Sequence, residues 1–381
     1  MIIAVLLLIT GHFIAMDGLF VLSQIPQENA RARVTEIIQR ISPEERLFYL
    51  DDYESGEVDD SFLTLLGESI IFEAETRNGQ RRGSTVLAEQ NLGGLSGESQ
   101  KEAALGDRVL LVNFGYGWFY NGHIRTGFLL GLGVLFTLCV LFFGGKKGFN
   151  TLLSLSLTCA AVFAVFIPSI LSGKNIYLMA ALVCIYATIT TLLIVAGYNK
   201  KALAASIGCI SGILVTGLIS VIMDNLLSLT GLLDEHSRHL ANLPIGTPID
   251  LRAIIFAGII IGAMGAIMDV SISIASSMWE IREKAGRISV KSLFQSGINI
   301  GRDIMGSMAN TLILAYIGGS LSVVLILSVY SNSLMELLNR EMIVVEILQA
   351  LAGIFGILSA MPLTAFFSAA LFLRDKKQAK I

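Results

Sequence analysis

Charge is what this sequence has least of. Asp, Glu, Lys and Arg make up only 15% of its 381 residues, whereas 54% are hydrophobic and the mean hydropathy is +0.72. The charges are also unevenly placed, so that long stretches carry none. Runs of about 20 apolar residues are what an α-helix needs to cross the hydrocarbon core of a bilayer. The composition therefore argues against a soluble protein and predicts a polytopic α-helical membrane protein.

Other absences exclude whole classes of function. No basic cluster stands beside an aromatic set, so nucleic acid is not an expected partner. The four cysteines fall inside predicted spans and form no C-x-x-C, which argues against disulfides and structural zinc. Four histidines, two of them in "DEHSRH" at 234–239, offer no third ligand for a metal. G-x-x-x-x-G-K-[ST] does not occur, so nothing indicates ATP-driven chemistry. We expect no cofactor and no enzyme.

Eight transmembrane helices are predicted. Residues 1–23 form the first; they lack a basic n-region and an A-x-A-like cleavage site, so we expect an uncleaved anchor with His12 and Asp17 embedded in it. The seven-helix membrane domain, 126–373, holds the predicted spans 127–144, 149–171, 176–197, 202–226, 251–277, 303–328 and 343–373. Residues 374–381 are a basic tail.

Between the first two helices lies a segment of a different kind, residues 24–125. From Gln27 to Arg125 it carries 17 acidic and 10 basic residues. Segments at 32–38 and 105–114 read as strands, and Asn78-Gly79 is a strong hairpin signal. The acidic stretch 42–62 reads as a loop with a short helix. A small, mainly β domain is predicted, large enough to fold alone.

Lys and Arg mark alternate connections, which sets the orientation. Basic pairs or clusters stand at Lys146/Lys147, at Lys200/Lys201, at 282–291 and in the tail, whereas the other connections hold single charges. The predicted topology is a plasma-membrane protein with both termini cytoplasmic and residues 24–125 extracellular.

One predicted span carries a stripe of small and polar residues. At spacings of four and three it contains Gly258, Gly262, Ala266, Asp269, Ser273, Ser276 and Glu280. These residues share one helical face, and isoleucines such as Ile260 and Ile267 occupy the other, which suits lipid or apolar neighbours. The next span repeats the pattern with Asn299, Asp303, Gly306 and Asn310, flanked by Ser307 and Thr311. We expect the two stripes to face each other or a common cavity.

The two aspartates have different explanations. A charge in hydrocarbon costs about 2.5–3.5 kcal/mol, so each needs a partner, water or a proton. Asp303 stands in the first turn of its predicted span, where the helix dipole favours it, and Arg302 can reach headgroups. Asp269 has no such help, which leaves two interpretations: a structural hydrogen bond to Asn310 or Arg302, or a proton or cation site.

Glycines four residues apart predict close helix contacts. They stand at 127/131, 208/212, 258/262 and 297/301, and Gly265 and Gly306 lie near the stripes. Gly318-Gly319-Ser320 either breaks its span into half-helices, as at transporter sites, or is a packing notch.

The stripe region resembles a known family. "PIDLRAIIFAGIIIGAMGAIMDVSISIASSMWEI" followed by "SGINIGRDIMGSMANTLILAYIGGSL" looks like the signature region of the YibE/F-like bacterial membrane proteins, and the outer domain resembles the YibE type. The signature residues are Gly262, Gly265, Asp269, Gly301, Arg302, Asp303, Gly306, Asn310 and Thr311. The resemblance implies a plasma-membrane protein of Gram-positive bacteria with a YibF-like neighbour, and it supplies no reaction.

Three functional hypotheses follow. The first is a secondary transporter or exporter in which Asp269 binds a proton or cation, Asp303 and Asn310 complete the site, and Ser273 and Ser276 line the route. The second is a non-transporting scaffold or sensor subunit, a hetero-oligomer with a YibF-like protein or a homo-oligomer. The third, an intramembrane aspartyl protease, is weakened because neither aspartate has the G-x-G-D setting.

Overall fold

The computed structural model describes residues 2–16, 28–48, 67–78, 82–92, 101–243, 248–285, 288–330 and 333–373. The chain forms two compact units. One comprises Ser23–Leu138, and the other comprises Met1–Leu22 together with Cys139–Ile381. Gly79 of the predicted hairpin, Asp17 and the basic tail lie outside the described residues.

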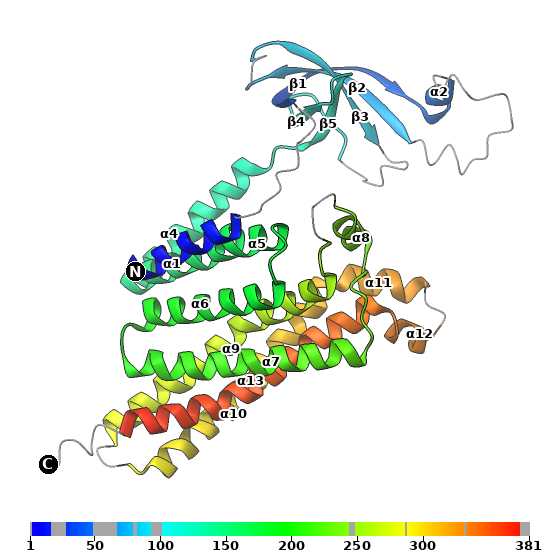
Figure 1. The fold of residues 1–381 in the computed structure, drawn as a ribbon. Helices are drawn as coiled ribbons and strands as arrows, with labels where there is room; N and C mark the ends of the chain where they lie inside the picture. The colour runs from blue at the N-terminus through cyan, green and yellow to red at the C-terminus, as the bar shows by residue number, and fades with distance from the viewer. Residues whose placement is uncertain are drawn as a thin grey trace. The chain divides into compact units, whose positions relative to one another are not determined.

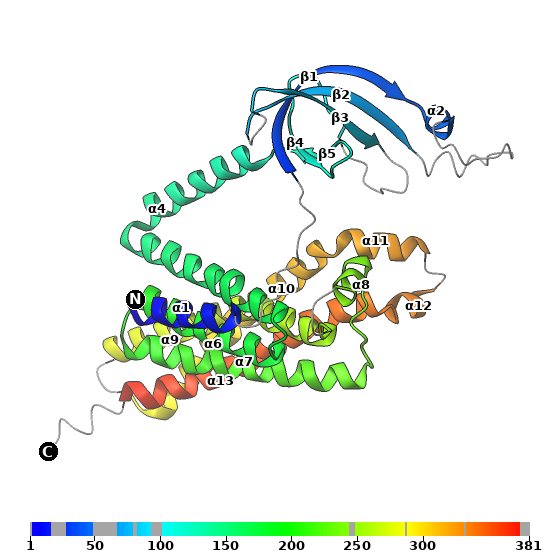
Figure 2. The ribbon, with the colours of Figure 1, turned by 45° about the horizontal axis from the view of Figure 1, so that its top comes forward.

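The first unit contains a closed five-stranded barrel (Figure 2). Its elements are β1 (Glu28–Ile41), α2 (Pro43–Phe48), β2 (Glu68–Thr76), β3 (Thr85–Leu92), β4 (Arg108–Asn113) and β5 (Trp118–His123). The strand order is β1-β2-β3-β5-β4, closed by the β1–β4 pair, and only β3 and β5 pair in parallel. This arrangement is that of the OB-fold barrel. The predicted strands, the β2–β3 hairpin and the short helix are confirmed.

Alternation along the strands places the barrel core. Ala30, Ala32 and Val34 of β1 are buried at every second position, as are Ile70, Phe72 and Ala74 of β2. Because side chains of a strand point to opposite faces in turn, one set fills the interior of the barrel. The polar residues between them face solvent.

The second unit is helical (Figure 1). Its elements are α1 (Ile2–Met16), α4 (Thr126–Ala161, which begins in the first unit), the π-helical turn η2 (Val162–Phe166), α5 (Ile167–Leu171), α6 (Ile176–Ala196), α7 (Lys200–Leu226), α8 (Glu235–Ala241), α9 (Leu251–Lys284), α10 (Val290–Gly319), α11 (Leu321–Tyr330), α12 (Leu334–Leu338) and α13 (Glu341–Leu373). In the described residues, five helices are long and apolar enough to cross a membrane, or six if the bent pair α10–α11 is one span.

The predicted separation of spans 127–144 and 149–171 is confirmed, as a kink rather than a loop. Helix α4 consists of two helices that meet at Gly145, whose backbone is not helical (φ 52°, ψ −129°). Glycine tolerates this left-handed backbone, so the chain turns there without needing a loop. With α1 only 15 residues long, the number of eight spans stays a prediction.

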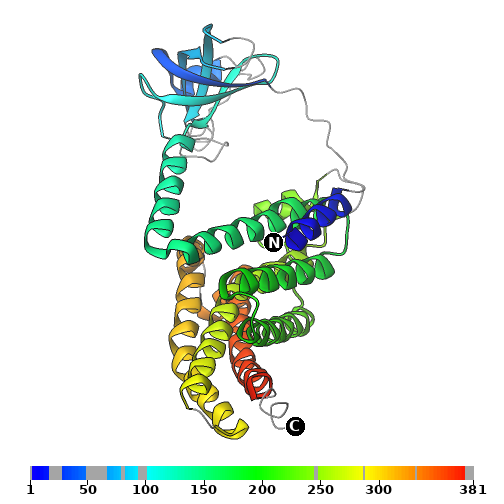
Figure 3. The same cartoon turned by 90° about the vertical axis from the view of Figure 1, so that its left-hand side faces the viewer.

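The helices that carry the two stripes extend beyond the predicted spans 251–277 and 303–328. Helix α9 continues to Lys284, and α10 already begins at Val290. The half-helix interpretation of Gly318-Gly319-Ser320 is confirmed: α10 ends at Gly319, and the α10–α11 pair is bent by 61° (Figure 3).

Helix α9 lies at the centre of the helical core, packed against α6, α7, α10 and α13. Glycine pairs allow these contacts. A Cβ at Gly212 would lie 2.8 Å from Ala360, and one at Gly208 would overlap Thr364. Gly297 and Gly301 admit Met278 and Met361 in the same way, whereas Gly127 and Gly131 face open space. The predicted close contacts are therefore confirmed at two glycine pairs and absent at 127/131.

Candidate functional site

The polar stripe of α9 is its outward face. Asp269, Gly258, Gly262, Gly265 and Glu280 are exposed, and Ala266, Ser273 and Ser276 are partly exposed. The opposite face is the buried one: Ile259, Ile260, Ile267, Ile274 and Met278 are at most 1% exposed. The sequence predicts either lipid or apolar neighbours for these isoleucines, and they are packed against apolar neighbours of the same chain.

The polar stripe of α10 is exposed as well. Asn299, Arg302, Asp303, Gly306, Asn310 and Thr311 all have high accessibility, whereas Gly297, Gly301 and Leu312 are buried against neighbouring helices. Within this chain the stripes therefore do not enclose a cavity, contrary to the expectation. They form an open polar surface along two adjacent helices, which we call the α9–α10 face.

Contacts between the antiparallel helices α9 and α10 show which residues of the two stripes lie side by side. A Cβ at Gly297 would lie 2.5 Å from Sδ of Met278, and one at Gly301 would lie 3.1 Å from Cδ1 of Ile274. In both contacts the residue moves forward along α10 as it moves back along α9. Extending this register places Asp269 beside Gly306. By the same register Asp303 is level with Ile272 and Ser273, about one helical turn from Asp269.

The side chains of the face have few internal partners. Thr311 donates to the carbonyl of Ser307 (2.9 Å), the usual intrahelical bond of such residues. Among the described residues, Asp269 makes no hydrogen bond or ion pair, so neither structural partner considered for it, Asn310 or Arg302, is engaged. A Cβ at Gly265 or Gly306 would have no atom within 4 Å, so the space beside Asp269 is open.

Comparison with known proteins bears on this face. The family model described as YibE/F-like protein matches residues 132–374. The chain belongs to the YibE/F-like family. No curated relative and no solved structure matches it. The match covers α4 from Leu132 through α13 and leaves out the barrel, so the α9–α10 face lies wholly within the part that defines the family.

Three polar residues near this face were not singled out from the sequence. Tyr316 of α10 and Gln349 of α13 approach Gly262: a Cβ there would lie 2.7 Å from the Tyr316 hydroxyl and 3.8 Å from Nε2 of Gln349. Glu346 stands three residues before Gln349 on α13. A signal was present in the sequence, since Glu346 is a carboxylate inside a predicted span.

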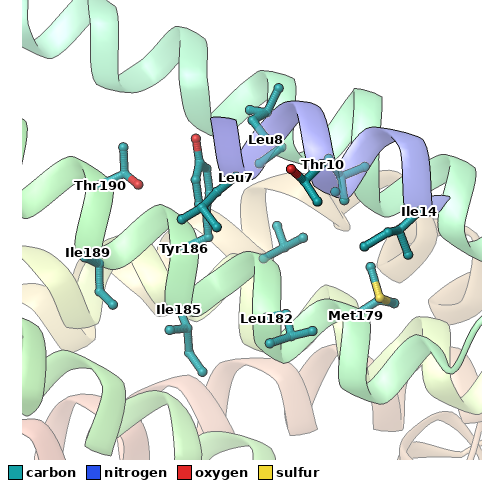
Figure 4. A pocket seen from close by; sticks show the side chains of 14 residues that line it. Leu7, Leu8, Thr10, Ile14, Met179, Leu182, Ile185, Tyr186, Ile189 and Thr190 are labelled. Atoms are coloured by element: carbon teal, nitrogen blue, oxygen red, sulfur yellow. The ribbon is translucent and has the colours of Figure 1, made fainter. Parts of the chain in front are cut away.

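An apolar cavity of the helical unit lies elsewhere (Figure 4). About 440 Å³ in volume, it lies between α1 and α6 and is bordered by apolar side chains such as Leu7, Leu182 and Ile189. Two of its three hydroxyls bond within the protein: Tyr186 donates to the carbonyl of Ala4 (3.1 Å) and Thr10 to that of Leu6 (2.9 Å). None of the predicted site residues lines this cavity.

The barrel holds a chain of hydrogen bonds of its own. The Tyr120 hydroxyl donates to Nδ1 of His123, and Nε2 of His123 donates to Asp107 (3.0 Å). The amide of Ala104 also donates to Asp107 (3.1 Å), and these bonds hold the pKa of the Asp107 carboxyl below its usual value. Burial raises the pKa of the Tyr120 phenol. The chain joins the ends of β4 and β5 and forms no metal cluster among the described residues.

Proposed function

We propose that this YibE/F-like chain is the membrane subunit of a secondary transporter or exporter of the plasma membrane. Asp269 binds a proton or cation, Asp303 and Asn310 complete the site, and Ser273 and Ser276 line the route. Both termini are cytoplasmic and the barrel is extracellular. The role requires no catalytic step and no cofactor.

One observation carries the proposal. Asp269 lies near the midpoint of the 34-residue helix α9, is exposed on its surface, and has no protein partner among the described residues. A bare carboxylate at such a depth costs about 2.5–3.5 kcal/mol, which a bound proton, a cation or water offsets. The open positions at Gly265 and Gly306 leave room for one of these beside it.

Flux in proteoliposomes tests the proposal. Vesicles contain the full chain, a pH-sensitive dye and a cytosolic small-molecule extract, and a potassium diffusion potential is imposed. We expect proton flux with the wild type, its loss in Asp269→Asn, and its retention in the control Glu235→Gln, which changes an exposed carboxylate on α8. Undiminished flux in Asp269→Asn would remove Asp269 from the mechanism.

Exposure of the α9–α10 face favours a second candidate, a non-transporting subunit of a membrane complex. A polar surface within apolar spans calls for a protein cover, and a YibF-like companion or a second copy would provide it. In that case Asp269→Asn and Gly306→Leu should reduce co-purification with the companion in mild detergent. Unchanged co-purification in both variants would argue against this candidate.

A further inference from the structure

Tyr316 carries a buried hydroxyl that has no hydrogen-bond partner among the described residues. A buried polar atom without a hydrogen-bond partner destabilises the folded protein by about 1–3 kcal/mol. Such atoms therefore usually bind a ligand, a water molecule or an ion. The hydroxyl lies beside Gly262 of α9, where a Cβ would come within 2.7 Å of it.

Two further polar groups gather at the same point from α13. The Gln349 carboxamide lies 3.7 Å from a Cβ built at Gly258 and 3.8 Å from one built at Gly262. Glu346 lies one turn away from Gln349 on the same face of α13. In the described part of the chain, neither Glu346 nor Gln349 has a hydrogen bond or ion pair.

A helix break adjoins this cluster. Helix α10 ends at Gly319, one turn beyond Tyr316, and the chain bends by 61° into α11. Ser320 is 5% exposed and donates to the carbonyl of Tyr316 (2.6 Å). Interrupted helices beside acidic and amide side chains are the places where membrane transport proteins hold ions.

Two other acidic groups near this end of the helical unit are held by backbone amides. Glu341 accepts from the amides of Thr230 and Gly231 (2.6 and 2.7 Å). Asp250 accepts from the amides of Arg252 and Ala253 and so caps α9, whereas Oδ1 of Asp224 is buried without a hydrogen-bond partner among the described residues. No cationic side chain in the described residues neutralises Glu346.

We propose that Glu346, Tyr316 and Gln349 form a second cation site, which takes a small monovalent cation, the proton or sodium. The carboxylate and phenol oxygens are hard ligands that such cations prefer. Gln349, whose Nε2 faces Gly258 and Gly262, adds its carboxamide oxygen once the amide group is flipped. The site lies about 10 Å from Asp269, since Gly262 and Asp269 are seven residues apart on α9. It is defined without Asp269 and stands whether or not the chain transports.

Two measurements on the full chain in nanodiscs distinguish the two cations. Equilibrium binding of ²²Na⁺ at pH 8 reports sodium, and infrared difference spectra between pH 5 and pH 8 report protonation of the carboxyl. We expect one of the two signals to be reduced in Glu346→Gln and retained in the control Glu235→Gln, which changes an exposed carboxylate on α8. Tyr316→Phe should weaken that signal about tenfold, the effect of one lost ligand contact.

A pair of glycine variants separates a local effect on the site from a general loss of folding. Gly262→Ala places a methyl group against the Tyr316 hydroxyl, whereas Gly265→Ala meets open space on the same face of the same helix. We expect Gly262→Ala to reduce the signal and Gly265→Ala to leave it unchanged, with both proteins monodisperse. Equal signals in the wild type and Glu346→Gln in both measurements would overturn the site, and loss of the signal in Asp269→Asn alone would assign it to the α9–α10 face instead.

Discussion

Single methyl groups decide where the helices of this bundle can touch. At Gly212 of α7 a Cβ would lie 2.8 Å from each of three atoms, in Ala360, Gly356 and Ile267, whereas at Gly131 it would meet nothing within 4 Å. We expect Gly212→Ala to destabilise the bundle by about 1–3 kcal/mol, the usual cost of overpacking. Gly131→Ala should be neutral. Thermal unfolding of the two variants in the same detergent measures the difference, and equal stabilities would contradict this packing.

The contribution of Asp107 to the stability of the barrel should depend on pH. Its pKa is lowered in the folded barrel by the bonds from Ala104 and His123, so its stabilisation is complete above the ordinary carboxyl pKa. It is lost as the pH falls through the lowered folded value. Asp107→Asn should therefore destabilise the barrel by about 1–2 kcal/mol at pH 7, and by less as the pH falls below the ordinary carboxyl pKa. Hydrogen exchange of β4 and β5 in the full chain, compared between variant and wild type at each pH, checks this. A difference that grows toward low pH would refute it.

At the scale of the element, the sequence predicts which residues share a face but not which face is buried. The period of α9 correctly groups Asp269 with Gly262 and Ser273, yet the grouping is the same whether the stripe points inward or outward. Lipid tails are as apolar as leucine, so an apolar helix face is equally stable against lipid and against another helix. Hydrophobicity alone therefore does not decide which face lies in the protein core. Contacts far apart in sequence, such as Ile267 with Gly356, make that choice.

The same limit explains the residues that the sequence did not single out. Glu346 stands five residues into α13, where a charge is also typical of a span that ends at the membrane surface. Tyr316 is an ordinary residue of an apolar helix until the fold brings Gly262 to its hydroxyl. The strands of the barrel were easier to predict, because alternation within one strand already indicates its inner face.

Helix α1 provides a prediction at this scale. It is held to the rest of its unit by polar contacts: Nδ1 of His12 lies 2.6 Å from the carbonyl of Ala164, in the π-helical turn η2, and Ser172 donates to the carbonyl of Ala15 (2.5 Å). A π-helical turn leaves carbonyls free for such partners. We expect His12→Ala combined with Ser172→Ala to speed hydrogen exchange across 2–16 severalfold, while Thr10→Ala, which removes only a bond within α1, does not. Equal exchange in both variants would show that apolar packing alone holds α1.

At the scale of the molecule, the two units have separate cores. The barrel core is built around Phe72, Ile70 and Leu111, and the main helical core around Ile267, Met278 and Phe372, with no residue in common. The family match follows the same division, since it spans 132–374 and leaves the barrel out. The family model therefore describes the helices and not the barrel.

Separate cores should unfold separately. Phe72 is fully buried in the barrel, and Phe72→Ala removes its ring at a cost of about 3–5 kcal/mol, a large fraction of the stability of a small domain. Phe372 is equally buried in the helical unit and provides the matched change, Phe372→Ala. We expect the first variant to accelerate hydrogen exchange only in β1–β5, and the second only in the helices that surround α13. Destabilisation that spreads from Phe72→Ala into α9 would show that the two units fold as one, because a cooperative unit shares the loss among all its parts.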